Sequence, residues 1–251
     1  MLALIGLGLD SGDISSRALD FIRSAGIVYA DKYTSIIGQR SIDFVKEKSG
    51  MDVTDVPRGE LEERVKATVA KAKGTDMAIL VIGDPLIATT HHIILDEAQK
   101  QGISVKIFHA PSIFSAAIGE SGLDIYKFGP TTTVPFWSER YKPTSFIDVI
   151  HKNLTNLQHT LVLFDIDPKG PSPMSIAQAA EIIGMADRNA YLKDSRVVVL
   201  GDIGRETQDI FYTELSKLQA YSKRLEGKTI SIIVPAELNF AEEDALKRFG
   251  T

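Results

Sequence analysis

The feature that most constrains the fold is a strand-length apolar run that ends in a glycine turn. Met77 to Ile82 is uniformly apolar, and Gly83-Asp84-Pro85 follows it directly. A run without polar alternation is typical of a strand that is buried on both faces of a parallel sheet. It is far shorter than the roughly 20 apolar residues that a membrane-spanning helix needs. The run therefore predicts a parallel α/β sheet in this part of the chain.

The residues before and after this run alternate between predicted strands and predicted helices. Strands are predicted at residues 2–7, 27–30 and 104–108, and amphipathic helices at 13–25, 59–73 and 90–101. Asp13 is the expected N-cap of the first helix. Alternation of this kind favours a mostly parallel sheet with helices on both faces. We assign residues 1–111 to an N-terminal α/β domain.

The pattern of residue types changes after Ala110-Pro111. Runs rich in β-branched and aromatic residues follow, with fewer helices between them. We expect a second α/β domain over residues 112–251, with a mixed sheet. A crevice between two such domains is the usual place for a small-molecule site.

Composition excludes several kinds of chemistry. The 251 residues include no cysteine, which removes disulfides, zinc–thiolate sites and cysteine nucleophiles. The net charge is −5 without a basic cluster, so we expect no nucleic-acid partner. Asp10 interrupts the first apolar stretch, which is too short for a signal peptide. His91 and His92 are adjacent and point apart on a helix, so we expect no metal site. The expected protein is soluble and cytoplasmic.

Three turns carry the candidate binding residues, and each follows a predicted strand. They span residues 6–13, 83–90 and 110–117. The carboxyl ends of parallel strands meet at one edge of a sheet, so these turns should converge on one crevice. Gly8 could let a ligand approach the backbone, in which case Gly8→Val would abolish binding with much less effect on stability.

Each turn also has a second interpretation. The first turn could bind a dinucleotide with Asp31 on the ribose, but Ser11 stands where that fingerprint requires glycine. Asp84 could bind ribose hydroxyls or an ammonium group, or it could cap its own turn. Ser112 could border an adenine ring or cap a helix. Trp137 could pack in a core or line the approach to a substrate.

Together these turns match a known family. The sequences GLGLDSGDIS near the start, YTS (33–35), GDPLIATTH (83–91) and HAPSIFSAAIGESGL (109–123) strongly resemble those of diphthine synthases. So do YKFG (126–129), PFW (135–137), HTLVLFDID (159–167), PM (173–174) and PAELNFAEEDAL (235–246). The likeness covers essentially the whole chain in collinear order. It identifies the chain as a member of the tetrapyrrole-methylase-like class of methyltransferases.

The resemblance implies a homodimeric enzyme that binds S-adenosylmethionine (SAM) in the cleft between its two domains. The implied cofactor contacts are Leu9, Asp84, Ile87, Ser112, Ile113, Phe164, Arg205 and Ile230. The implied methyl acceptor is the α-amino group on the 3-amino-3-carboxypropyl chain of a modified histidine in elongation factor 2. The sequence departs from the family at residues 200–205 and at Asn239, where relatives often have histidine.

Two other enzymes could use a similar fold. A methyltransferase acting on a tetrapyrrole precursor needs a basic trough, which the net charge of −5 disfavours. A nicotinamide-dependent oxidoreductase would use the first glycine turn, but Ser11 disfavours it. No catalytic acid–base pair is apparent from the sequence.

Overall fold

The computed structural model describes residues 1–31, 38–166 and 172–250. The chain divides into two compact units, Met1–Ile113 and Phe114–Thr251. The sequence placed the boundary between residues 111 and 112. Each unit has its own sheet and its own hydrophobic core.

The first unit is built on a five-stranded sheet in the order β3-β2-β4-β1-β5, in which every pairing is parallel. Its strands are β1 (Leu2–Gly6), β2 (Ile27–Asp31), β3 (Thr54–Val56), β4 (Met77–Val81) and β5 (Val105–Phe108). Every residue of β1 and β4 is buried, which explains why their sequences are uniformly apolar. The expected parallel sheet is confirmed.

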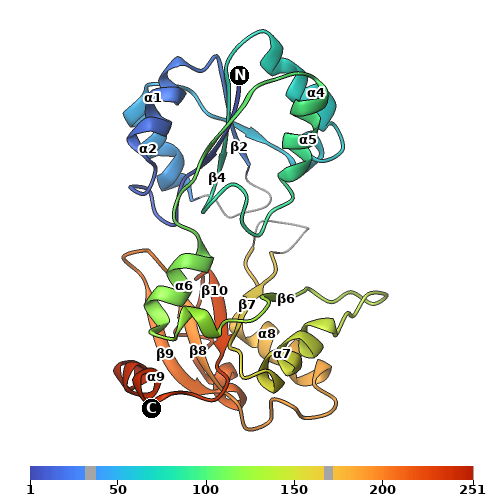
Figure 1. Ribbon diagram of the computed structural model, residues 1–251, viewed down its shortest axis with the longest axis vertical. Coiled ribbons are helices and arrows are strands. Elements are labelled where there is room, and N and C mark those ends of the chain that lie inside the picture. The colour runs from blue at the N-terminus through green and yellow to red at the C-terminus, as the bar shows by residue number, and fades with distance from the viewer. Residues whose placement is uncertain (32–37, 167–171, 251) are drawn as a thin grey trace. The chain divides into compact units, whose positions relative to one another are not determined.

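Helices cover both faces of this sheet (Figure 1). They are α1 (Ser16–Ser24), α2 (Gln39–Ser49), α3 (Arg58–Leu61), α4 (Val65–Ala70), the 3-10 helix η1 (Lys71–Lys73) and α5 (His92–Lys100). Ile5 and Leu80 pack in a core with α1 and α2. Leu4 and Ile79 point to the opposite face and pack with α4 and α5. Successive residues of one strand therefore serve two separate cores.

The first helix begins later than its sequence predicts. It starts at Ser16, and Ser15 is its N-cap, whose Oγ accepts a hydrogen bond from the Ala18 amide at 3.2 Å. Asp13 was the expected cap, and that prediction is wrong. Both residue types are good N-caps. Asp13 does not cap the helix because its carboxylate accepts hydrogen bonds from backbone amides in the turn before the helix.

The helix predicted over residues 59–73 is broken into α3, α4 and η1. The Thr68 hydroxyl donates to the carbonyl oxygen of Glu60 at 2.8 Å, which satisfies a backbone group near the break. Helix α2 and strand β3 were not predicted from the sequence. Ile42 and Val45 are the buried apolar residues of α2, so its apolar stripe is short.

The second unit contains a mixed sheet in the order β6-β7-β10-β8-β9. Its strands are β6 (Thr132–Val134), β7 (Thr160–Phe164), β8 (Arg196–Gly201), β9 (Asp209–Glu214) and β10 (Ile230–Val234). Strands β6 and β7 pair in parallel, and the remaining pairs are antiparallel. The mixed sheet expected for the C-terminal half is confirmed.

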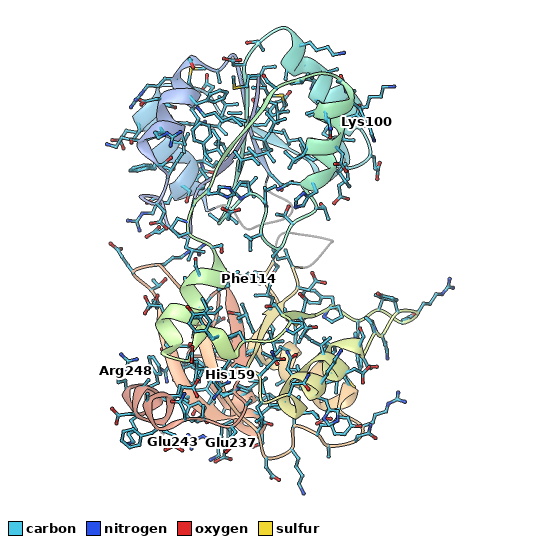
Figure 2. The ribbon with its side chains drawn as sticks, in the orientation of Figure 1. Lys100, Phe114, His159, Glu237, Glu243 and Arg248 are labelled. Atoms are coloured by element: carbon cyan, nitrogen blue, oxygen red, sulfur yellow. The ribbon has the colours of Figure 1, made fainter. Side chains whose placement is uncertain are left out.

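The second unit also contains helices. They are α6 (Ile113–Ser121), η2 (Ile125–Lys127), α7 (Ser145–Thr155), α8 (Ile176–Ala186), η3 (Leu215–Tyr221), α9 (Phe240–Leu246) and η4 (Lys247–Phe249). Helices α7 and α8 pack in one core with Ile230, Ile232 and Val234 of β10. Side chains fill the space around the sheet, and His159 lies within the unit (Figure 2).

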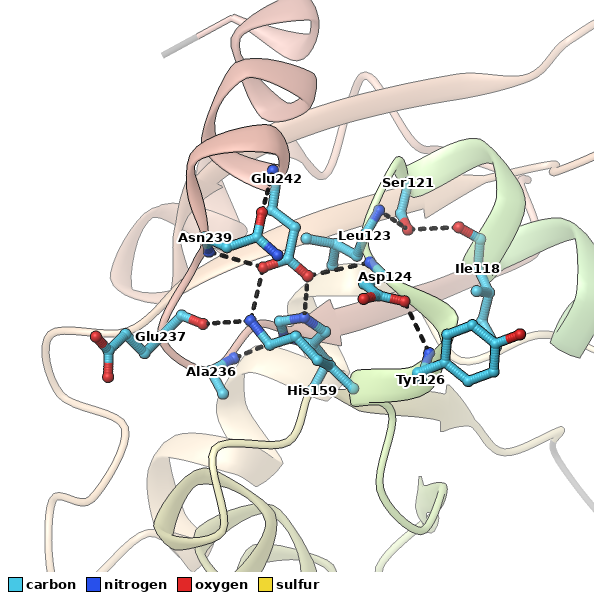
Figure 3. A network of polar contacts seen from close by, with 11 residues as sticks. Ile118, Ser121, Leu123, Asp124, Tyr126, His159, Ala236, Glu237, Asn239 and Glu242 are labelled. Atoms are coloured by element: carbon cyan, nitrogen blue, oxygen red, sulfur yellow. Dashed lines mark hydrogen bonds and ion pairs between the residues drawn. The ribbon is translucent and has the colours of Figure 1, made fainter.

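The buried carboxylate of Glu242 connects α9 to other segments of this unit (Figure 3). The Glu242 side chain is 2% exposed. One of its oxygens accepts from Lys127 Nζ at 2.6 Å and from the Asn239 amide at 2.9 Å. The other accepts from His159 Nε2 at 2.8 Å and from the Asp124 amide at 3.0 Å. Burial alone would raise the pKa of Glu242, but these hydrogen bonds outweigh it and hold the pKa at about 2.

His159 is fully buried, and its two ring nitrogens have different partners. Nδ1 accepts a hydrogen bond from the Ala236 amide at 2.9 Å, so the ring proton is on Nε2, which donates to Glu242. Burial lowers the pKa of His159. Asn239 caps α9, since its side chain accepts from the Glu242 amide at 3.0 Å. Asparagine therefore has a structural role at this departure from the family pattern.

Candidate functional site

Three loops of the first unit lie side by side at the carboxyl edge of its sheet. Strand β1 lies between β4 and β5, and its pairings match Gly6 with Val81 and Ile5 with Phe108. The turns that follow these three strands therefore start from adjacent positions. These are the turns that the sequence singled out, and the fold brings them together.

The first two loops are joined through their backbones. The Gly8 amide donates to the Gly83 carbonyl at 3.2 Å, and the Gly83 amide donates to the Gly8 carbonyl at 2.7 Å. A Cβ on Gly6 would lie 2.6 Å from the Gly83 oxygen and 2.8 Å from the Ala110 side chain. All three loops thus pack so closely that no side chain fits at Gly6.

Gly8 is required by its own turn. Its φ is +75°, and a Cβ there would lie 2.0 Å from the Asp13 side chain. The Asp13 carboxylate accepts from the amides of Leu9 at 2.9 Å and Asp10 at 3.0 Å. The expectation that Gly8→Val would spare stability does not fit this geometry. Any larger residue would disturb the turn whether or not a ligand is bound.

Asp84 connects the second and third loops. Its side chain is 8% exposed. Oδ1 accepts from the Leu86 amide at 3.0 Å, so Asp84 does cap its own turn. Oδ2 lies 2.7 Å from His109 Nδ1 and 3.3 Å from the Ala110 amide. The result is a largely buried carboxylate at the loop edge, with an exposed imidazole beside it.

A second histidine–aspartate contact lies deeper in the same unit. His91 is 2% exposed, and its Nδ1 lies 3.0 Å from the Pro85 carbonyl oxygen. Its Nε2 lies 2.9 Å from Oδ2 of Asp31, which is fully buried. An Asp31 carboxylate in that position is not presented to a ribose. This placement counts against the nicotinamide-dependent reading.

The remaining first-unit candidates lie on these loops or just after them. Ile87 is 41% exposed, whereas Ser112 is 7% exposed. Ile113 is the first residue of α6 and follows Ser112 directly. The fold therefore brings Leu9, Asp84, Ile87, Ser112 and Ile113 to one edge of the sheet. The motif Tyr33-Thr34-Ser35 lies outside the described residues, as does Asp167 at the end of another motif.

The three second-unit candidates gather at one end of the mixed sheet. Phe164 ends β7, Ile230 begins β10, and Arg205 lies in the loop after β8. The register pairs the residue before Phe164 with the residue after Ile230, and pairs Ile230 with Gly201. Arg205 Nη1 lies 3.5 Å from Asp202 Oδ1. The structure thus assembles this group within its own unit.

Trp137 has features of both of its interpretations. It is partly buried against the second unit's core, and its Nε1 donates to the Pro143 carbonyl at 3.1 Å. Lys142 Nζ lies 5.7 Å from the centre of its ring. Trp137 also lines a hollow of about 360 Å³, together with Phe136, Glu181 and Met185. The indole is therefore structural, yet it borders a space that a ligand could enter.

Among the residues that the structure describes, no helix is long and apolar enough to cross a membrane. The same residues contain no group of three histidine, aspartate or glutamate side chains that is arranged to hold a metal ion.

Sequence and structure comparisons show the family to which the chain belongs. The family model of tetrapyrrole (corrin/porphyrin) methylases matches residues 1–219. A diphthine synthase of Methanococcus aeolicus is 36% identical, over 98% of this chain and 97% of that protein. One from Methanothermobacter thermautotrophicus is 36% identical, over 98% of this chain and 94% of that protein. A crystal structure of diphthine synthase aligns with a TM-score of 0.89 at 33% identity, covering 99% of this chain and 95% of that one. The chain therefore belongs to the tetrapyrrole methylase family and, within it, to the diphthine synthases, which are SAM-dependent methyltransferases.

Proposed function

We propose that the protein transfers methyl groups from SAM to the α-amino group of the 3-amino-3-carboxypropyl-histidine of elongation factor 2. The observation that carries this proposal is the 36% identity to diphthine synthases over nearly the whole of both chains. Likeness over that length includes both units and all the loops described above.

We assign SAM to the two clusters of candidate residues. In the first unit, Ile87 offers an exposed apolar side chain near the Asp84 carboxylate, which suits a ligand with both an apolar face and cationic groups. Leu9, Ser112 and Ile113 border the same edge. In the second unit, Phe164, Arg205 and Ile230 would supply the remaining contacts. When bound, SAM supplies an electrophilic methyl group on a sulfonium, so the residues' task is to orient it and exclude water.

The acceptor nitrogen must be neutral when it attacks the methyl group. A free α-amine has a pKa of about 8, so roughly a tenth is neutral at pH 7. Each new methyl group leaves a positive charge on nitrogen. A further transfer is possible only after that nitrogen loses a proton, and a third transfer would produce a fixed quaternary cation.

Mass spectrometry of elongation factor 2 tests the function. The substrate is factor that carries the 3-amino-3-carboxypropyl group, incubated with SAM and this protein. Mass increases of one or more methyl groups on that histidine are expected. Factor without the preceding modification is the control and should gain none. Absence of methylation on the modified factor, with a tetrapyrrole precursor methylated instead, would favour the alternative enzyme.

Calorimetry tests the cofactor separately. SAM should bind, whereas NAD and NADP should not, because Asp31 is buried against His91. Binding of a nicotinamide cofactor in place of SAM would overturn the assignment.

The assembly and location belong to the same proposal. We propose a homodimer that acts in the cytoplasm, where elongation factor 2 is found. Tyr126 is 92% exposed, Ile125 is 59% exposed and Phe240 is 83% exposed. Their two segments are linked through Glu242, which binds the Asp124 amide and Lys127. A second copy of the chain would cover such apolar side chains. Light scattering on the purified protein should give twice the mass of one chain.

A further inference from the structure

We propose that His109, held by Asp84, accepts the proton that the acceptor nitrogen must lose before methyl transfer. This inference rests on the proposed function. His109 lies in the third loop of the first unit, three residues before Ser112. Its partner Asp84 lies in the second loop. The pair therefore stands at the edge of the sheet where the cofactor residues converge.

The geometry of the pair suits a proton acceptor. His109 Nδ1 lies 2.7 Å from Asp84 Oδ2, and the two side chains are 68% and 8% exposed. An ionised carboxylate accepts a hydrogen bond from Nδ1–H, which leaves the lone pair of a neutral ring on Nε2. Among the described residues, Asp84 is the charged side chain that contacts His109. The carboxylate also stabilises the imidazolium that forms when Nε2 takes a proton.

The other four histidines lack this combination. His91 and His159 are buried, and both ring nitrogens of each are already bonded. His151 lies in the second unit, stacked on Tyr191. His92 is exposed on α5 and contacts no carboxylate in the part of the chain that the structure describes. Within residues 1–31, 38–166 and 172–250, His109 is the histidine that joins an exposed ring to a buried carboxylate at the candidate site.

The proton balance is simple. The acceptor ammonium gives one proton to His109 Nε2 and becomes a neutral amine. Its nitrogen then forms a bond to the methyl carbon of SAM, while the bond from that carbon to sulfur breaks and sulfur keeps the electron pair. The products are S-adenosylhomocysteine and a methylated ammonium. Because the His109 ring is exposed, the proton then passes to solvent, and the cycle can repeat until no N–H remains.

His109→Asn separates proton transfer from loop structure. The asparagine amide can still donate to Asp84 where Nδ1 did, but it has no group that accepts a proton at neutral pH. SAM affinity by calorimetry should stay within about threefold. The single-turnover methylation rate should fall about tenfold at pH 7, because only roughly a tenth of the free amine is neutral there without a proton acceptor. The rate should recover above about pH 8, where the amine is neutral without help.

His92→Asn is the matched control and should keep the wild-type rate at every pH. A second variant, His109→Ala, should regain methylation when imidazole is added, with no change in SAM affinity. A folded His109→Asn enzyme with the wild-type rate and pH profile would overturn the inference. Loss of SAM affinity in that variant would also overturn it, because His109 would then be a cofactor contact. If wild-type protein fails to methylate elongation factor 2 at all, the proposed function itself fails.

Discussion

Replacing Glu242 with glutamine should destabilise the second unit in a pH-dependent way. The carboxylate accepts four hydrogen bonds, from Lys127, Asn239, His159 and Asp124. Glutamine keeps one acceptor oxygen, which can still serve two of these donors. The glutamine NH₂ group would face the other two hydrogen-bond donors. Buried donors would then lack an acceptor, which is costly.

The pKa of Glu242 gives the size of its contribution to the free energy of unfolding. It is lowered from 4.5 to about 2 in the folded protein. At about 1.36 kcal/mol for each tenfold change in proton affinity, this corresponds to about 3 kcal/mol of stability at neutral pH. Because the folded pKa is depressed, the unfolded state binds a proton first as the pH falls. The stabilisation is therefore complete above about pH 4.5 and is lost as the pH falls toward 2.

Urea unfolding at several pH values measures this effect. At pH 7, Glu242→Gln should lower the free energy of unfolding by about 3 kcal/mol, as expected when a buried ion pair loses one partner. At pH 3.5 the difference between variant and wild type should have narrowed by about 1.4 kcal/mol. Glu243→Gln is the control, since Glu243 is exposed one residue away, and its stability should match the wild type. A difference that is the same at both pH values would refute the assigned pKa.

Three further substitutions test the candidate site. Gly8→Val should lower the free energy of unfolding by about 3 kcal/mol or more, because its side chain collides with Asp13 at a positive φ; an unchanged melting temperature would contradict this. Asp84→Ala should weaken SAM binding roughly tenfold to a hundredfold by freeing the loop at Ala110, and calorimetry showing wild-type affinity would remove Asp84 from the site. Trp137→Leu should cost about 1–3 kcal/mol of stability through lost packing and the lost bond to Pro143. If Trp137 also borders the acceptor, partially methylated elongation factor 2 should accumulate, and a normal product distribution would leave it a packing role alone.

The sequence by itself determined the fold class, and it predicted the edge of the sheet at which a ligand would bind. The uniform apolar run of β4 is typical of a strand buried on both faces, because a half-exposed strand alternates polar and apolar residues. Glycine turns at the ends of such strands lie at the edge where ligands usually bind in a parallel sheet. The capping box between Asn239 and Glu242 involves residues only three apart, but it was not predicted from the sequence.

Tertiary structure decided which of several chemically similar residues does which task. Asp13 and Ser15 are both residue types that can cap a helix. Ser15 caps α1 because the Asp13 carboxylate accepts a hydrogen bond from the Leu9 amide instead. His109 contacts Asp84 because β4 and β5 lie on either side of β1. The local sequence pattern does not predict this strand order.

The same holds for the C-terminal acidic cluster, where Glu242 is buried and Glu243 is exposed. The two residues are the same type in adjacent positions. Only the fold brings His159, 83 residues away, against one of them. Local sequence sets which backbone conformations are stable, whereas burial and charge pairing depend on contacts between segments that are distant along the chain.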